Sequence, residues 1–219
     1  MYTTENHIRL AAIKLISRNG FEAMSLRQLA AHAQVTTSTL YLYFQKKDEL
    51  LLALVMEYLE GLSLQWQRRR PAAARADVQL LTFIAGHVRF HLEHQDQAIL
   101  GNLEFRSLHA EAQVKVRHAQ RLYLNSLQAV LEKGVKEGCL RCAEPKLMAR
   151  TLSNLLTHAC IWYQDDGRWC IDEVISHYSA LVLKMLGAAP SAFQGRPAAR
   201  TISRRHTPNA MLKPLVQVS

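Results

Sequence analysis

The sequence predicts an all-α protein, with a three-helix helix-turn-helix domain followed by a larger helical bundle. Apolar residues recur at helical spacing through most of the chain, and the strict apolar–polar alternation of a strand is missing. Caps, glycines and prolines divide this pattern into segments of ordinary helix length. We divide the chain into residues 1–47, 48–70, 71–187 and 188–219.

The first two helices are predicted from spacing and caps. One covers residues 4–19 and stops at Gly20. Its apolar face is formed by Ile8, Ala11, Ala12, Leu15 and Ile16. The next begins at about Leu26, because Ser25 and Gln28 have the spacing of a capping box.

A tight turn at residues 34–35, with Val35 directed inward, leads into the third helix. Thr36 or Thr37 caps this helix, and its apolar side carries Leu40 and Phe44. Its other side is polar, aromatic and almost uncharged, and consists of Thr36, Thr37, Ser38, Tyr41 and Tyr43.

That polar side suits a helix that enters a DNA major groove. Hydroxyl groups can bond base edges or phosphates. Lys46 and Lys47 follow directly, where their charge would meet the sugar-phosphate backbone. The alternative is an ordinary helical hairpin with a solvated polar face, because such hairpins are common in all-α proteins.

The remaining helices follow from the same signals. Asp48 is the predicted cap of a long amphipathic helix that continues to Arg68, Arg69 and Arg70 before Pro71. These arginines could clamp phosphate, but we favour stabilisation of the helix C-terminus. Further helices are predicted over residues 77–94, then on to about 108, and over 111–137, 145–164 and 171–186.

Composition and charge narrow the class of protein. A hydrophobic content of 49% excludes wholesale disorder. Net charge is +9, yet residues 71–187 carry thirteen Lys and Arg against twelve Asp and Glu. The excess lies in residues 1–70 and in 188–219, a proline-containing basic segment that we predict to be a disordered tail. No apolar stretch reaches the roughly 20 residues of a membrane span, and no signal peptide is evident, so we expect a cytoplasmic protein.

Residues 40–50, Leu-Tyr-Leu-Tyr-Phe-Gln-Lys-Lys-Asp-Glu-Leu, resemble the signature LYxYFxxKxxL of TetR-type transcriptional repressors. Upstream positions from Ala11 to Ala30 are similar to the rest of that domain. The resemblance implies a homodimeric repressor, with the second motif helix reading a double-stranded DNA operator. It also implies a C-terminal domain that senses a ligand.

Carried over by position, the resemblance assigns DNA contacts. Residues expected to face bases are Thr36, Thr37, Ser38 and Leu42. Residues expected to hold phosphates are Ser25, Arg27, Tyr41, Tyr43 and Lys47. The sequence departs from the family at Thr37, where a basic residue is frequent, and at Ser38, where glycine is frequent.

The second domain carries a looser resemblance. Segments 90–94, 104–108 and 161–167 are similar to TetR-type regulators that respond to acyl-CoA thioesters. This implies a hydrophobic effector, such as an acyl-CoA, whose acyl part would lie among Phe83, His87, Phe90, Leu103 and Trp162. Arg89 or Arg106 would meet the CoA phosphates, although Arg106 could instead pair with Glu104. The alternative is that these aromatic residues are plain core.

The last two helices offer more apolar surface than one bundle needs, which predicts a four-helix dimer interface. Its predicted members are Leu152, Leu155, Leu156, Ala159, Ile175, Tyr178, Leu181, Val182 and Met185.

Two further motifs have weak functional interpretations. His87, His91 and His94 share a helix face, but no carboxylate or cysteine completes a metal site. Cys139 and Cys142 form an isolated C-x-x-C that we interpret as reduced thiols. No cofactor, metal or catalytic residue is therefore predicted. The alternatives to a ligand-responsive repressor are an architectural DNA-binding protein or a metal-using helical enzyme.

Overall fold

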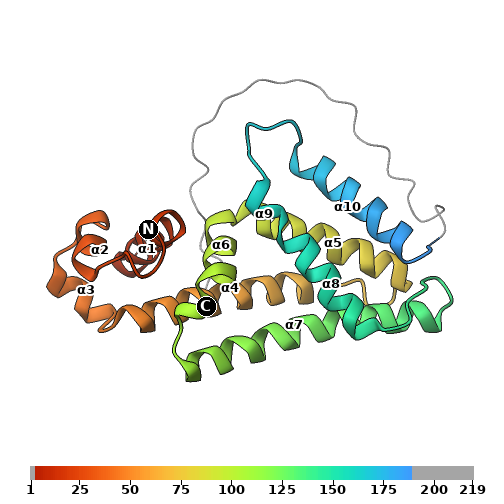
Figure 1. Ribbon diagram of the computed structural model, residues 1–219, viewed down its shortest axis with the longest axis horizontal. Helices are drawn as coiled ribbons and strands as arrows, with labels where there is room; N and C mark the ends of the chain where they lie inside the picture. Colours follow the sequence, from red (N-terminus) through yellow and green to blue (C-terminus); the bar gives the residue numbers. More distant parts are fainter. Residues whose placement is uncertain (1–2, 189–219) are drawn as a thin grey trace. The chain divides into compact units, whose positions relative to one another are not determined.

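A computed structural model describes residues 3–188, and every regular element in that range is a helix (Figure 1). The helices are α1 (Thr4–Asn19), α2 (Leu26–His32), α3 (Thr37–Tyr43), α4 (Lys47–Arg69), α5 (Ala76–Glu93), α6 (Gln95–Leu103), the 3₁₀ helix η1 (Glu104–Ser107), α7 (Ala110–Lys136), α8 (Pro145–Thr157), α9 (Ala159–Trp162) and α10 (Ile171–Met185). The predicted all-α fold is confirmed. The predicted basic tail, from residue 189 on, lies outside the described residues.

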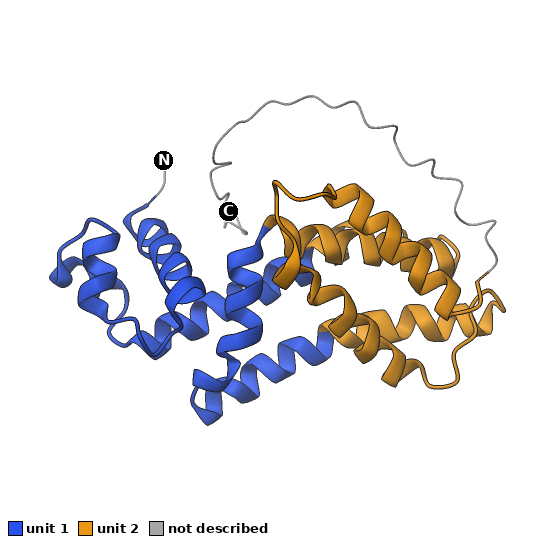
Figure 2. Ribbon diagram, turned by 45° about the horizontal axis from the view of Figure 1, so that its top comes forward, with its two compact units in different colours: residues 1–64, 94–122, 214–219 blue, residues 65–93, 123–213 orange. Residues whose placement is uncertain are grey.

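Two compact units divide the described residues (Figure 2). The first holds residues 3–64 and 94–122, and the second holds 65–93 and 123–188. Helices α4 and α7 therefore each contribute to both units. This division differs from the predicted partition, because residues 94–122 join the unit that contains the helix-turn-helix.

The first unit buries the apolar faces predicted for its helices. Ile8, Ala12 and Ile16 of α1 are almost fully buried, as are Leu29 of α2 and Leu40 of α3. Burial of apolar side chains of this size contributes about 1.5–3 kcal/mol each for the larger ones. These residues hold α3 in place while its other side remains exposed.

The turns of the first unit need unusual backbone angles. Gly20 ends α1 with φ at 82°, a conformation that glycine adopts at little cost. The backbone N–H of Phe21, next in the chain, donates to Glu104 Oε1 at 3.1 Å. Gln34, in the predicted turn between α2 and α3, also has a positive φ of 57°. Val35 is half-buried, which is less than the inward position predicted for it.

The second unit is organised around α5, which packs against α8, α9 and α10. Its side chains Leu80, Phe83 and Ile84 are essentially inaccessible. Arg89 of α5 forms an ion pair with Asp172 at the start of α10 and a longer one, 3.7 Å, with Glu93. Apolar packing and one charged link thus join the central helix to its neighbours.

Three predicted helix boundaries were wrong. The helix predicted to reach Leu108 ends at Leu103 and continues as the tighter η1. The helix predicted over residues 145–164 is interrupted at His158 and resumes as the short α9. Asp48 lies in the first turn of α4 and not at its cap. Periodicity continued across the first two breaks, which is why it did not reveal them.

No helix within residues 3–188 is both long and apolar enough to cross a membrane.

Candidate DNA-binding helix and effector site

Helix α3 presents its predicted reading side to solvent. Thr37 and Ser38 are exposed, and so are Tyr41, Leu42 and Tyr43. Leu42 has 82% of its surface accessible. The helix therefore offers hydroxyls, two phenol rings and one apolar side chain, with no carboxylate among them.

Thr36 caps the N-terminus of α3. Its Oγ1 accepts from the backbone N–H of Thr39 at 3.1 Å and lies 3.2 Å from Ser38 Oγ. Thr36 is thus the N-cap that the sequence predicted as one of two possibilities, since α3 begins at Thr37. Any contact of Thr36 with a base would have to share this hydroxyl with the cap.

The predicted phosphate contacts lie at the start of α2, on α3 and at the start of α4. Ser25 and Gln28 form the predicted capping box, with bonds of 3.2 and 2.9 Å. Arg27 is exposed beside them. Lys47 Nζ lies 3.2 Å from a carboxylate oxygen of the exposed Glu22 and 4.5 Å from the centre of the Phe21 ring. A surface pair of this kind is weak, so a DNA phosphate could replace Glu22 at small cost.

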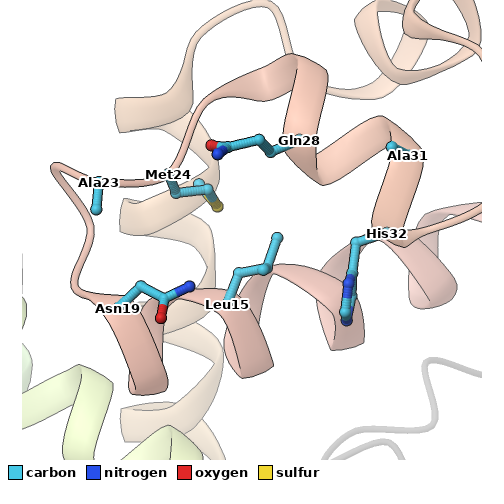
Figure 3. Close-up of a pocket in the computed structure, with 7 residues that line it drawn as sticks. All are labelled: Leu15, Asn19, Ala23, Met24, Gln28, Ala31 and His32. Atoms are coloured by element: carbon cyan, nitrogen blue, oxygen red, sulfur yellow. The ribbon is translucent and has the colours of Figure 1, made fainter.

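The first unit also contains an open groove of about 440 Å³ (Figure 3). Side chains of α1, α2 and the segment between them point into it, namely Leu15, Asn19, Ala23, Met24, Gln28, Ala31 and His32. None of the predicted DNA-contacting residues lines it.

The predicted effector residues fall into two groups. Phe83, His87 and Phe90 are buried in the second unit, where Trp162 is 46% exposed. Leu103 and Arg106 are exposed and belong to the first unit. The carboxylate of Glu104, offered above as a partner for Arg106, instead accepts from Phe21 N–H and Ser107 Oγ. Arg89, the other candidate for CoA phosphates, is already paired with acidic residues.

A polar cluster lies at the centre of the second unit. The rings of His87 and His91 stack with centroids 4.0 Å apart, and both residues are 2% exposed. Thr157 Oγ1 lies 3.0 Å from His87 Nε2 and 3.2 Å from His91 Nε2. Tyr123 Oη lies 3.0 Å from His87 Nδ1. Sequence spacing had grouped the two histidines, whereas nothing near Tyr123 or Thr157 in the sequence indicated that they would join them.

Burial sets the protonation of this cluster. Desolvation lowers the pKa of His87 well below its usual value, and the neighbouring His91 lowers it further. Burial raises the pKa of Tyr123 well above its usual value. His87 and Tyr123 are therefore neutral near pH 7.

A narrow crevice reaches this cluster from the surface. It is too narrow to admit a water-sized sphere, because the roughly 180 Å³ between its atoms is interstitial space and open solvent. Its lining residues are Gln65, Trp66, Arg69, Thr82, Phe83, Gly86, His87 and Tyr123. Trp66 and Phe83 meet edge to face, 5.1 Å between ring centroids, and form an aromatic wall. The crevice thus combines an exposed arginine, apolar walls and the polar groups of the cluster.

Four of the nine predicted dimer-interface residues belong to the core of a single chain. Leu152, Leu156, Ala159 and Val182 are completely buried, so they cannot form a surface for a partner. Leu181 and Met185 are about 45% exposed, and Leu155, Tyr178 and Ile175 are half-buried. The apolar surface that remains lies on one side of α10 and on α8.

Histidines and cysteines form no metal cluster in the described part of the chain, where no three His, Cys, Asp or Glu side chains come together suitably. Cys139, Cys142, Cys160 and Cys170 are free thiols. Burial raises the pKa of Cys160 to about 11, which makes that thiol unreactive.

Two family models match the chain. The model described as bacterial regulatory proteins of the tetR family matches residues 8–54, and the model described as the tetracyclin repressor-like C-terminal domain matches residues 73–186. The second match alone covers more than half of the chain.

Relatives agree with this assignment. A fatty acid metabolism regulator protein of Bacillus subtilis is 28% identical over 182 residues, which are 81% of this chain and 91% of that protein. A tetR-family regulatory protein from Rhodococcus RHA1 superposes with a TM-score of 0.82 at 21% identity, covering 86% of this chain and all of that one. AibR, solved with isovaleryl coenzyme A and operator DNA, superposes with a TM-score of 0.75 at 20% identity, covering 84% and 98%. The chain belongs to the TetR family of DNA-binding transcriptional regulators and is not an enzyme.

Proposed function

We propose that the protein is a homodimeric repressor that binds a palindromic operator and is released by a hydrophobic effector, an acyl-CoA thioester. The observation that carries the DNA-binding part is the exposed side of α3. It presents Thr37, Ser38 and Leu42 outward from a helix whose other side is fixed in the core. Side chains of this size can read base edges when the helix enters the major groove.

Two relatives support an acyl-CoA as the effector. One solved neighbour was captured with an acyl-CoA together with operator DNA, and the Bacillus relative is named for fatty acid metabolism. In this chain the crevice of the second unit provides a cation, Arg69, beside the aromatic walls of Trp66 and Phe83. A charged head group joined to an apolar body matches that combination.

The remaining exposed apolar residues of α8 and α10 support the dimer. Leu181 and Met185 protrude from α10, one helical turn apart, and the half-buried Tyr178 precedes them by one turn. A two-fold dimer supplies two copies of α3, one for each half-site of a palindromic operator. The interface is correspondingly smaller than the sequence predicted.

Helix α4 links the proposed DNA-binding site to the proposed effector site within one chain. It begins at Lys47, a predicted phosphate contact, and its last turns supply Gln65, Trp66 and Arg69 to the crevice. A ligand that binds more tightly to one position of this helix would shift the population of DNA-competent dimers. A difference of a few kcal/mol is sufficient for regulation.

The direct test is a mobility shift with operators isolated from a random duplex library. We expect a palindromic consensus, a complex that resists excess random duplex, and release of that complex by dodecanoyl-CoA. A complex competed away equally by any duplex would contradict the repressor and support an architectural protein. A specific complex that no acyl-CoA releases would contradict the effector alone.

A matched pair of variants tests the proposed dimer interface. Leu181→Glu places a charge on the exposed side of α10, and Val114→Glu places one on α7, at a position that is more exposed still. Sedimentation equilibrium should give a monomer for the first variant and a dimer for the second. Two dimers would show that α10 does not form the interface.

A further inference from the structure

Lys47, the first residue of α4, is held by the loop between α1 and α2. Its Nζ lies 4.5 Å from the centre of the Phe21 ring and 3.2 Å from Oε2 of Glu22. Phe21 and Glu22 are consecutive, so both contacts come from one short stretch of backbone. An ammonium group over an aromatic ring is attracted by the negative face of that ring. The position of Phe21 therefore decides where the charge of Lys47 lies.

The backbone of Phe21 is held by a residue far along the chain. Gly20 ends α1, with its N–H donating to the Ile16 carbonyl at 2.8 Å, and the chain then leaves the helix. The next N–H, that of Phe21, donates to Glu104 Oε1 at 3.1 Å. This bond joins residues 83 positions apart that belong to the same compact unit (Figure 2). Glu104 therefore fixes the point at which the loop leaves α1.

Glu104 is anchored on its own side of this bond. Its other oxygen, Oε2, accepts from the Ser107 hydroxyl at 2.8 Å within η1. The preceding helix α6 packs against α1 and lies close to α4, since a Cβ added to Gly101 would come within 3.0 Å of the Tyr58 ring. The carboxylate is thus held in place at the end of α1.

We infer that Glu104 is a positioning residue for the contact between Lys47 and a DNA phosphate. Its bond to Phe21 fixes the ring over which the Lys47 ammonium lies, so that the charge is in place before DNA binds. This inference rests on the phosphate contact predicted for Lys47. It adds a residue from outside the predicted DNA-binding domain, residues 1–47.

Glu22 holds the same ammonium group in a different way. Its side chain is 77% exposed, so a DNA phosphate can take its place at small cost. Phe21 is 1% exposed and remains under Lys47 when DNA binds. Glu22→Gln should therefore leave operator affinity unchanged or raise it slightly. A loss as large as that of Glu104→Ala would assign the positioning of Lys47 to Glu22 and overturn the inference.

A matched pair of variants separates the hydrogen bond of Glu104 from its charge. Glu104→Ala removes both, whereas Glu104→Gln removes the charge but keeps an oxygen that can accept from the Phe21 N–H. The lost negative charge affects DNA binding equally in the two variants. We expect Glu104→Gln to bind the selected operator about fivefold more tightly than Glu104→Ala. Equal affinities would overturn the inference.

The same comparison in a Lys47→Met background tests whether the effect passes through Lys47. Lys47→Met alone should weaken operator and random DNA alike, and lower the slope of log affinity against log salt by about one. In that background Glu104→Gln and Glu104→Ala should bind equally, because the group that Glu104 positions is gone. A difference that persists would overturn the inference and leave the phosphate contact of Lys47 intact. Unchanged DNA binding by Lys47→Met would contradict that contact and the inference with it.

Proton–carbon spectra test the positioning of Lys47 without DNA. The ring current of Phe21 should shift the ε-methylene protons of Lys47 upfield in the wild-type protein and in Glu104→Gln. In Glu104→Ala this signal should move toward the position of an ordinary lysine. An unmoved signal would overturn the inference, whatever the DNA measurements give.

Thermal unfolding of each variant shows whether it is folded. If Glu104→Ala does not fold, Ser107→Ala replaces it, because it removes one of the two bonds that hold the Glu104 carboxylate. The Lys47 signal should then move in the same direction by a smaller amount. No movement would again overturn the inference.

Discussion

The reading helix and the sensor core place their functional groups in opposite ways. In α3 the candidate side chains are exposed and lie within one short helix, and Leu42 is 82% accessible. In the second unit the candidate polar groups are buried, and His87 is 2% accessible. They come from three helices, with Tyr123 and Thr157 lying 36 and 70 positions from His87.

This difference fits the ligands that we propose for the two regions. DNA is a large polyanion that stays in water, so its contacts must project from the protein surface. A hydrophobic effector is recognised by removal from water, so its contacts must lie inside. Substitutions in the reading helix should therefore change binding with little change in stability, whereas those in the sensor should change both.

The largest effect should separate core from surface among the residues predicted for the dimer. Leu156→Ala removes a fully buried side chain, and we expect a loss of about 2–5 kcal/mol in the free energy of unfolding. Leu181→Ala, at a position 45% exposed, should cost under about 0.5 kcal/mol of intrinsic stability. Denaturant unfolding over a range of protein concentrations measures both effects and separates out any loss of dimerisation. Similar losses would contradict the assignment of Leu156 to the core.

The next prediction separates base contacts from phosphate contacts on α3. Thr37→Val should change preference at one base pair by about 1–3 kcal/mol, because it would alter a base contact. Tyr43→Phe should weaken operator and random DNA equally, since a lost phosphate contact carries no sequence information. Competition binding against single-base operator variants measures this. A change of preference in Tyr43→Phe would show that the two roles were assigned wrongly.

Acid should lower the free energy of unfolding, because the unfolded chain binds a proton at His87 more readily than the folded protein does. The pKa of His87 is lowered in the folded protein, so below about pH 6.5 the unfolded chain binds the proton more readily. Above that pH the contribution of His87 to the free energy of unfolding should no longer change with pH. It should fall by about 1.4 kcal/mol per pH unit from there down to the folded-state pKa.

The control for this prediction is His87→Phe. In this variant the slope of the free energy of unfolding against pH, between pH 5 and 6.5, should fall by the equivalent of about one bound proton. Glu57, whose pKa is raised by burial, contributes with the opposite sign at acid pH. The difference between wild type and variant cancels that contribution. Identical slopes would show that His87 does not control the acid response.

The smallest effect should come from the cap of α3. Thr36→Ala should lower the free energy of unfolding by about 1 kcal/mol, because Thr36 Oγ1 accepts from Thr39 N–H. Thr36→Asp should keep that stability and yet weaken DNA binding through repulsion of the phosphates. Thermal unfolding and operator affinity, measured on both variants, separate the two roles. Equal affinity in Thr36→Asp and wild type would place Thr36 away from DNA.

The sequence alone predicted the helical fold, the capping box at Ser25, the turn at Gln34 and the family. These features depend on neighbours within a few residues, and local hydrogen bonds and helical periodicity are visible in such windows. The break at His158 escaped prediction, because apolar periodicity on both sides of it was compatible with one continuous helix.

Tertiary structure alone decided which apolar faces are core and which polar groups meet. Periodicity shows that Leu152 and Leu181 lie on apolar faces, but not whether the same chain or a second copy covers them. Likewise, the spacing of His87 and His91 gave no sign of Tyr123 or Thr157, because nothing local links residues so far apart in the chain. The physical reason is that burial and long-range hydrogen bonds depend on how the helices pack. Periodicity and caps depend only on the amino-acid sequence of each helix and its flanking residues.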